Sequence, residues 1–316
     1  MNRYLLERLT GSLVVLFLVV TITFFMIQAA PGGLSILMDP GMSPAEAERI
    51  ARNLGLHDPP HVQYLNWITN FLSGDLGNSL SYGGRPVLNM VLERLPATIL
   101  LGVSSALLAL LVAIPAGIIA ARYRNSITDQ TLSFLSSIGL ATPNFWLGIM
   151  LIVLFSVELG WLPSSGMRTV GEPFSLSDRL IHLILPTIVL GTSTIAELMR
   201  YTRSSWLEVI GLDYIRVAQS KGLAPVAVDL HHVMKNALIP VITVFGVILP
   251  RLIGGSAIVE TLFSWPGLGQ LAVDAALRRD TPLILGITIF VSVIVIISNL
   301  IIDMLYPLLD PRIRYE

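Results

Sequence analysis

The chain has 316 residues, of which 53% are hydrophobic and only 13% are charged, and its mean hydropathy is +0.74. A soluble domain carries about 25% charged residues, so this composition is typical of a protein embedded in a membrane. The net charge of −1 argues against a nucleic-acid-binding protein, and the lack of cysteine excludes disulfides and thiolate metal sites.

Six apolar stretches are each long enough to cross a bilayer, which takes about 17–25 mostly apolar residues. They cover residues 9–30, 97–121, 131–157, 180–196, 237–259 and 281–302, and the fourth, which is short, extends past Glu197. The first could be the core of a signal peptide, but it is longer than the roughly 7–15 residues of such a core, and residues 28–30 make a poor cleavage site. We therefore expect a retained anchor and an all-α polytopic membrane protein with six transmembrane helices.

Basic residues indicate which loops face the cytoplasm, because short loops rich in Lys and Arg stay on that side. A cytoplasmic location is indicated for the loop at 200–236 and for the positions of Arg3, Arg8, Arg122, Arg124, Arg312 and Arg314. Six spans is an even number, so both termini are predicted to be cytoplasmic.

The segment 31–95 is predicted to lie outside the membrane and to be helical. Residues 43–46 form a capping box with proline at the first helical position, and Asp58 with Pro59 opens a second helix. Tyr64, Trp67 and Phe71 share one face of that helix by their spacing of three and four. This stripe fits two uses equally: it rests on the membrane interface, or it docks an external partner.

The most informative polar segment is the loop at 200–236, which contains both lysines of the chain, Lys221 and Lys235. Asp213 can open a short helix, Gly222 can end it in the left-handed conformation, and Pro225 can start a second helix. A helix–glycine–helix elbow that projects from a membrane protein is typical of a docking site for another protein.

Several catalytic classes are excluded by missing motifs. Neither lysine follows a glycine, so the chain has no phosphate-binding P-loop, and it contains neither H-E-x-x-H nor G-x-S-x-G. His57 and His61 flank two prolines, which spoils a helical metal-binding face. We expect no catalytic residues, no metal site and no cofactor bound by this chain.

Ordered motifs along nearly the whole chain resemble the membrane-spanning permease subunit of bacterial ABC importers, in the dipeptide/oligopeptide family. They are residues 74–77 (GDLG), 94–98 (RLPAT), 143–148 (PNFWLG), 159–163 (LGWLP), 200–204 (RYTRS), 213–216 (DYIR), 221–223 (KGL), 236–240 (NALIP), 265–269 (WPGLG) and 310–315 (DPRIRY). The general importer loop pattern is matched only in part, whereas the peptide-importer version R-x-A-x-x-K-G is matched in full by Arg216, Ala218, Lys221 and Gly222.

The resemblance implies a type I ABC importer permease fold with three regions. Residues 1–95 would hold the first span and the extracytoplasmic cap, 96–309 the permease core with its coupling loop at 200–236, and 310–316 a cytoplasmic tail. It also implies a translocation pathway shared with a second, homologous permease in a heterodimer, two cytoplasmic ATPase subunits that bind ATP and Mg, and an extracytoplasmic solute-binding protein. Peptides, glutathione and nickel complexes all travel through similar permeases of the bacterial inner membrane.

Three groups of residues follow from this resemblance and from the sequence pattern. The ATPase-coupling residues are expected to be Asp213, Tyr214, Arg216, Ala218, Lys221, Gly222 and Leu223. Candidates for the translocation path are Pro250, Arg251, Gly254 and Gly255. Candidates for docking the binding protein, on exposed aromatic surface, are Tyr64, Trp67, Phe71, Trp265, Pro266 and Gly267.

Two questions stay open at this point. Arg251, counted from Glu260, lies roughly 13 Å inside its predicted helix. It either lines the path and meets a substrate carboxylate, or it reaches the outer headgroups or an acidic group of the partner permease. A secondary transporter or a channel without an ATPase is the alternative function, although no inverted repeat, mid-membrane ionisable cluster or selectivity filter is evident.

Overall fold

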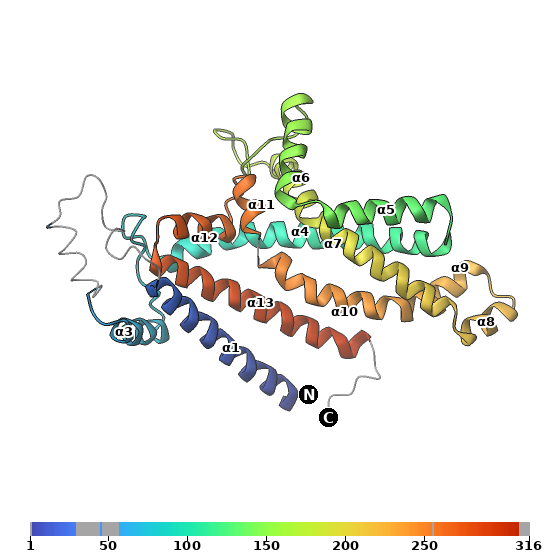
Figure 1. The fold of residues 1–316 in the computed structure, drawn as a ribbon, viewed down its shortest axis with the longest axis horizontal. Helices are drawn as coiled ribbons and strands as arrows, with labels where there is room; N and C mark the ends of the chain where they lie inside the picture. Colours follow the sequence, from blue (N-terminus) through green and yellow to red (C-terminus); the bar gives the residue numbers. More distant parts are fainter. Residues whose placement is uncertain (1, 30–44, 46–56, 255, 310–316) are drawn as a thin grey trace. The chain divides into compact units, whose positions relative to one another are not determined.

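The computed structural model describes residues 2–29, 45, 57–254 and 256–309, and these are almost entirely helical (Figure 1). The helices in chain order are α1 (Asn2–Ala29), α3 (Pro60–Leu72), α4 (Val87–Arg122), α5 (Ile127–Ala141), α6 (Asn144–Leu151) with its π-helical continuation η2 (Ile152–Glu158), α7 (Leu176–Ile210), α8 (Asp213–Ser220), α9 (Pro225–Val228), the π-helical turn η3 (Asp229–Val233), α10 (Met234–Ile253), α11 (Ala257–Leu262), α12 (Leu268–Leu277) and α13 (Thr281–Leu309). The predicted all-α class is confirmed. Of the capping box at residues 43–46, only residue 45 is described and it is helical; the rest of the helix expected there lies outside the described residues.

Within the residues that the structure describes, five helical segments are long and apolar enough to cross a membrane on their own: 7–29, 87–122, 176–210, 225–253 and 281–304. The expected third span is not one straight helix, because α5 and the α6–η2 segment meet at an angle of 105°. Thr142 has an extended backbone (φ −82°, ψ 120°) in front of Pro143, as expected for a residue that precedes proline. Residues 131–157 carry no charge, so their composition gave no sign of this break. If the bent pair is counted as one span, the described residues contain up to six membrane spans.

Two predicted boundaries were wrong. The fourth span begins at Leu176 and continues to Ile210, so Arg200 and Arg203 belong to α7 and not to a loop. The fifth span ends at Ile253, and Val259 belongs to the separate helix α11. Helical hydrogen bonding continued through the charged turns of α7, whereas Gly254 ended α10 before its apolar run was complete.

The chain divides into two compact units, one made of 1–98 with 266–294, the other of 99–265 with 295–316. Residues 266–294 thus group with the N-terminal region, and the division expected at residue 95 stays a prediction. In the first unit the core includes the fully buried Val87, Leu268 and Leu283. The buried Asp280 accepts hydrogen bonds from Ser79 Oγ at 2.5 Å and from the backbone N–H of Ser81 at 2.9 Å. That carboxylate therefore attaches the loop before α4 to the start of α13.

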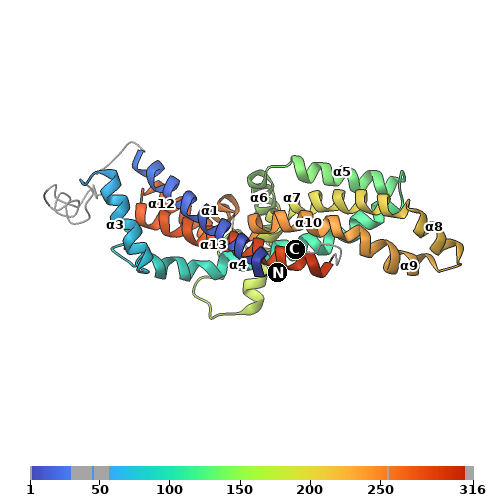
Figure 2. The same cartoon turned by 90° about the horizontal axis from the view of Figure 1, so that it is seen from below.

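In the second unit α7 lies between α5 and α10, side by side with both in the two views (Figures 1 and 2). Small residues allow this close packing. A Cβ on Gly102 would lie 2.7 Å from the carbonyl oxygen of Leu252, and one on Gly117 would lie 2.8 Å from that of Met199. The helices α4, α7 and α10 therefore approach each other almost backbone to backbone.

An ion pair fixes the start of α5 to α7. Arg203 Nε and a terminal guanidinium nitrogen donate to the two carboxylate oxygens of Asp129, at 2.6 and 2.8 Å. Asp129 is buried, and it also accepts from the backbone N–H of Asn125 at 2.9 Å. Such a bidentate arrangement specifies geometry as well as attraction, so it sets the register between α5 and α7.

Candidate functional site

The elbow between α7 and α10, residues 211–230, has the helical punctuation that the sequence indicated. Asp213 is the first residue of α8 and the acidic residue of its first turn, while Leu212 is at the N-cap position. Gly222 follows the helix with φ at +76°, in the left-handed region, and Pro225 begins α9. The predicted helix–glycine–helix elbow is confirmed.

One face of the elbow packs onto the chain itself. Ile215 and Ala218, three residues apart in α8, lie in a buried cluster with Trp206 and Val209 of α7 and with Val228, Val233 and Ala237. Residues spaced by three share a helix face, and this face is turned inward. Ala218 is only 6% exposed, so the expectation that it contacts an ATPase directly was wrong. Its small side chain lets α8 lie close against α7.

Away from this buried face, the elbow exposes large apolar side chains among polar ones. Tyr214, Val217, Leu223 and Val226 are all large hydrophobic side chains with exposed fractions of 41–58%. We name these four residues the elbow patch. An exposed apolar patch rimmed by polar groups is typical of a protein interaction site, and here Arg216 and Lys221 form part of the rim.

Two polar contacts involve exposed side chains of the elbow. Asn236 Nδ2 donates to Tyr214 Oη at 2.8 Å, which ties α8 to the first turn of α10. Arg216 pairs with Asp213 at 3.2 Å, but both side chains are largely exposed, and such pairs contribute only about 0–1 kcal/mol. Both groups can therefore exchange this contact for one with a partner.

The candidates for the translocation path are not gathered in one site. Pro250 is buried, Gly254 follows the last residue of α10, and Gly255 lies outside the described residues. Arg251 lies two residues before the end of α10, so the estimate that placed it deep inside its helix was wrong. Its guanidinium lies 3.6 Å from the carboxylate of Glu197 in α7. Sequence reasoning noticed both residues as interruptions of spans but did not pair them.

The aromatic docking candidates are largely used inside the protein. Tyr64, Trp67 and Phe71 are partly buried: Trp67 stacks on Phe71 with ring centroids 5.7 Å apart, and Trp67 lies 5.9 Å from Phe24 of α1. They join α3 to α1. Trp265 has no exposed surface and Gly267 is buried, so the prediction of an exposed Trp265 turn was wrong. Pro266 is partly buried.

Comparison with known proteins places this geometry in a family. Residues 1–102 match the N-terminal model of binding-protein-dependent transport system membrane components. Residues 113–315, which include the whole elbow, match the model of the binding-protein-dependent transport system inner membrane component. The chain belongs to this family. It is a membrane permease component.

Relatives and solved structures agree with that assignment. The permease is 45% identical over 316 residues to the oligopeptide transport system permease protein AppB of Bacillus subtilis, with 100% of both chains covered. It is 42% identical over 323 residues to a putative peptide transport system permease protein of Brucella abortus, again with full coverage of both. The inward-facing MetNI methionine ABC transporter has a chain with a TM-score of 0.56 and 17% identity, covering 70% of this permease and 97% of that chain. The type I permease fold is thereby confirmed.

Proposed function

We propose that this permease forms half of the translocation pathway of an ATP-driven ABC importer for peptides. Relatives of full length are named as peptide or oligopeptide permeases, and the fold is that of an importer permease. The observation that carries the proposal is the elbow patch, whose apolar side chains are exposed on the polar segment that joins α7 to α10. The substrate is a peptide or a related small solute such as glutathione or a nickel complex.

The elbow patch is the surface that docks a cytoplasmic ATPase subunit. Val217, Leu223 and Val226 supply apolar contact, while Arg216 and Lys221 can pair with acidic groups of the partner. The buried side of the elbow is fixed to α7 through Trp206, so a push on α8 moves α7 with it. ATP and Mg bind to the ATPase subunits, and this chain has no catalytic role.

The assembly contains a second, homologous permease, two ATPase subunits and an extracytoplasmic solute-binding protein. The basic elbow faces the cytoplasm, and with an even number of spans both termini lie on that side of the inner membrane. Partly exposed residues of α3, including Tyr64 and Trp67, lie on the extracytoplasmic side, where the binding protein arrives. Alternation of the pathway requires that ATP and peptide each bind its two states with different affinity.

The test is co-purification of the ATPase subunits with elbow variants. Val226→Asp and Leu223→Asp place a charge in the elbow patch and should lower ATPase capture roughly tenfold, since burying one such side chain is worth about 1.5–3 kcal/mol. Val170→Asp is the matched control. It makes the same change at a residue that is 95% exposed and lies in the loop before the first residue of α7, at the end of this helix that is away from the elbow. Wild-type capture by both elbow variants would contradict the proposal.

A further inference from the structure

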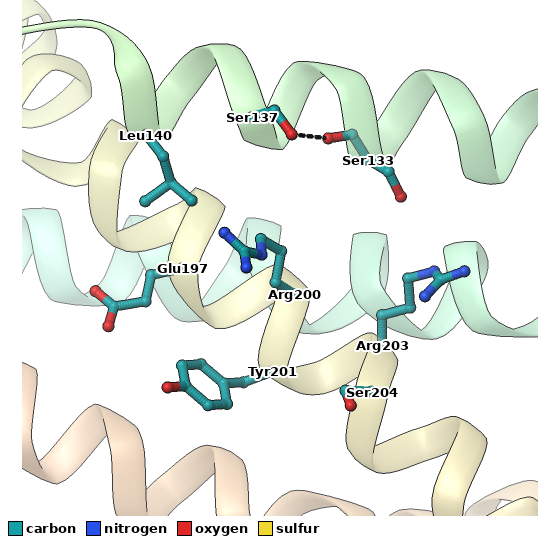
Figure 3. Close-up of a pocket in the computed structure, with 8 residues that line it drawn as sticks. All are labelled: Ser133, Ser137, Leu140, Glu197, Arg200, Tyr201, Arg203 and Ser204. Carbon is teal, nitrogen blue, oxygen red and sulfur yellow. Dashed lines mark hydrogen bonds between the residues drawn. The ribbon is translucent and has the colours of Figure 1, made fainter.

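A groove lies between α5 and α7, on the side of α7 that faces away from the α4 contacts (Figure 3). Its volume is about 680 Å³, and its lining is mixed polar and charged, with Leu140 as the one large aliphatic side chain. Ligand pockets in proteins commonly measure about 300–1,000 Å³, so this groove is large enough for a short peptide. Nothing in the function proposed above assigns a role to it.

The α7 wall of the groove is a continuous polar stripe. Glu197, Arg200, Tyr201 and Ser204 follow each other at spacings of three, one and three, and they lie on one face of the helix (Figure 3). The neighbouring positions Leu198, Met199 and Thr202 are buried in the helix packing. On the opposite wall, Ser133 and Ser137 of α5 lie one turn apart. The Ser137 hydroxyl donates to the backbone carbonyl of Ser133 at 2.9 Å, so its oxygen remains able to accept a hydrogen bond from a ligand in the groove.

The groove carries one uncompensated positive charge. Arg203 is paired with Asp129 at 2.6 Å, and Glu197 is paired with Arg251 at 3.6 Å. Arg200 is exposed, and in the part of the chain that the structure describes its guanidinium makes no ion pair or hydrogen bond. Figure 3 shows its side chain extending from α7 toward the α5 side of the groove, where Ser137 lies. The groove is thus suited to an anionic group.

A lipid-facing location does not suit this charged stripe. At 1.5 Å per residue the 35-residue α7 is about 52 Å long, which exceeds a hydrocarbon core of roughly 30 Å. The stripe lies in the half of α7 that leads to the elbow, after the apolar run. Charged residues on membrane-crossing helices almost always face a water-filled cavity or another protein chain. The stripe is therefore expected at the elbow-side end of the pathway.

We propose that the α5–α7 groove is a substrate subsite at the cytoplasmic end of the pathway, in which Arg200 binds the carboxylate of the passing peptide. The guanidinium can donate two parallel hydrogen bonds to a carboxylate, and Ser137 and Tyr201 lie within the same groove to receive the adjoining backbone. The subsite rests on the proposed peptide-import function and names the chemical group that this half of the pathway recognises.

The test uses the fact that the natural chain has no cysteine, so a single introduced thiol can be modified alone on this subunit. Arg200→Cys is assembled into the complete transporter in proteoliposomes and supplied with the binding protein and trialanine. Loss of the charged donor should lower trialanine uptake about tenfold or more. Modification of the thiol with a cationic aminoethyl reagent should restore uptake, and modification with an anionic sulfonatoethyl reagent should not. Saturating trialanine should slow both modifications.

Arg124→Cys is the matched control, because Arg124 is also exposed but lies in the turn between α4 and α5, outside the groove. Its modification rate should not respond to trialanine. A thiol at position 200 that cannot be modified in the assembled transporter would show that the second permease covers the groove, and would overturn the proposal. Equal recovery with both reagents, or a modification rate insensitive to trialanine, would overturn it as well. Failure of the wild-type transporter to import trialanine and every other peptide, glutathione or nickel complex supplied with the binding protein would instead refute the proposed function itself.

Discussion

Replacing Gly222 tests the link between the geometry of the elbow and transport. This residue has φ at +76°, and its backbone N–H donates to the carbonyl oxygen of Gln219 at 2.9 Å, so it forms the corner between α8 and α9. A Cβ at this position would meet no heavy atom within 4 Å. The whole cost of a substitution therefore comes from the left-handed backbone and not from a clash.

That cost can be graded by the choice of residue. A left-handed conformation costs an L-residue roughly 1–2 kcal/mol, while Asn adopts it more readily and a β-branched residue less readily. A change of 1–2 kcal/mol alters the ratio of two conformations about 5–30-fold. Peptide uptake is therefore expected to fall in the order Gly222→Asn, Gly222→Ala, Gly222→Val, with the last variant near the background level.

The assay is ATP-dependent peptide uptake by the reconstituted transporter, with the amount of membrane-inserted permease measured in parallel. Gly160→Val is the matched control, because Gly160 also has a left-handed backbone (φ +64°) with open space around a Cβ, but it lies in the loop before α7. It should insert as well as Gly222→Val and retain uptake. Wild-type uptake by Gly222→Val at normal insertion, or equal losses in Asn and Val variants, would refute the role of the corner.

Three further changes follow from the packing. Ala218→Leu should overpack the buried side of the elbow and lower the unfolding free energy by about 1–3 kcal/mol, whereas an ATPase-contact role alone would leave the thermal transition of the solubilised permease unchanged. Asp129→Asn should lower the unfolding free energy by about 2 kcal/mol, because Arg203 loses a charged acceptor. Asp213→Asn, which removes a charge from an exposed ion pair, should change it by less than about 0.5 kcal/mol, and equal shifts in the two variants would contradict this expectation. Trp265→Ala should lower it by about 3–5 kcal/mol, and binding-protein-stimulated and basal ATP hydrolysis should fall together, because its ring is wholly buried; loss of only the stimulated rate would contradict this.

The places where sequence reasoning failed share a physical cause. It placed Arg200 in a loop because charged residues ended an apolar run, but a helix ends only where its backbone hydrogen bonds end, and in α7 they continue to Ile210. It assumed an exposed Trp265 because aromatic residues gather at interfaces. Burial depends on neighbours that are distant in sequence, and no local pattern reports them.

Local chemistry was read correctly where one residue alone decides the conformation. Gly222 has a left-handed backbone and Pro225 starts a helix, because both preferences belong to the residues themselves. Pro143 could also have been read in this way, since it restricts Thr142, but the apolar composition around it was given more weight. The family resemblance followed from short motifs and their order along the chain, and both can be read from the sequence without knowing how the helices pack.

The sequence by itself determined the membrane class, the helical composition, the family and the position of the elbow, because hydropathy, charge and turn preferences are properties of short segments. Only the tertiary structure decided which face of the elbow is free, because Ile215 and Ala218 are buried by side chains from α7 and α10. The same holds for the partners of charged groups. Asp129 pairs with Arg203 and Glu197 pairs with Arg251, which leaves Arg200 as the unpaired cation among the described residues that line the groove. The sequence could not predict these pairs, because an ion pair depends on distances between helices that are far apart in the chain.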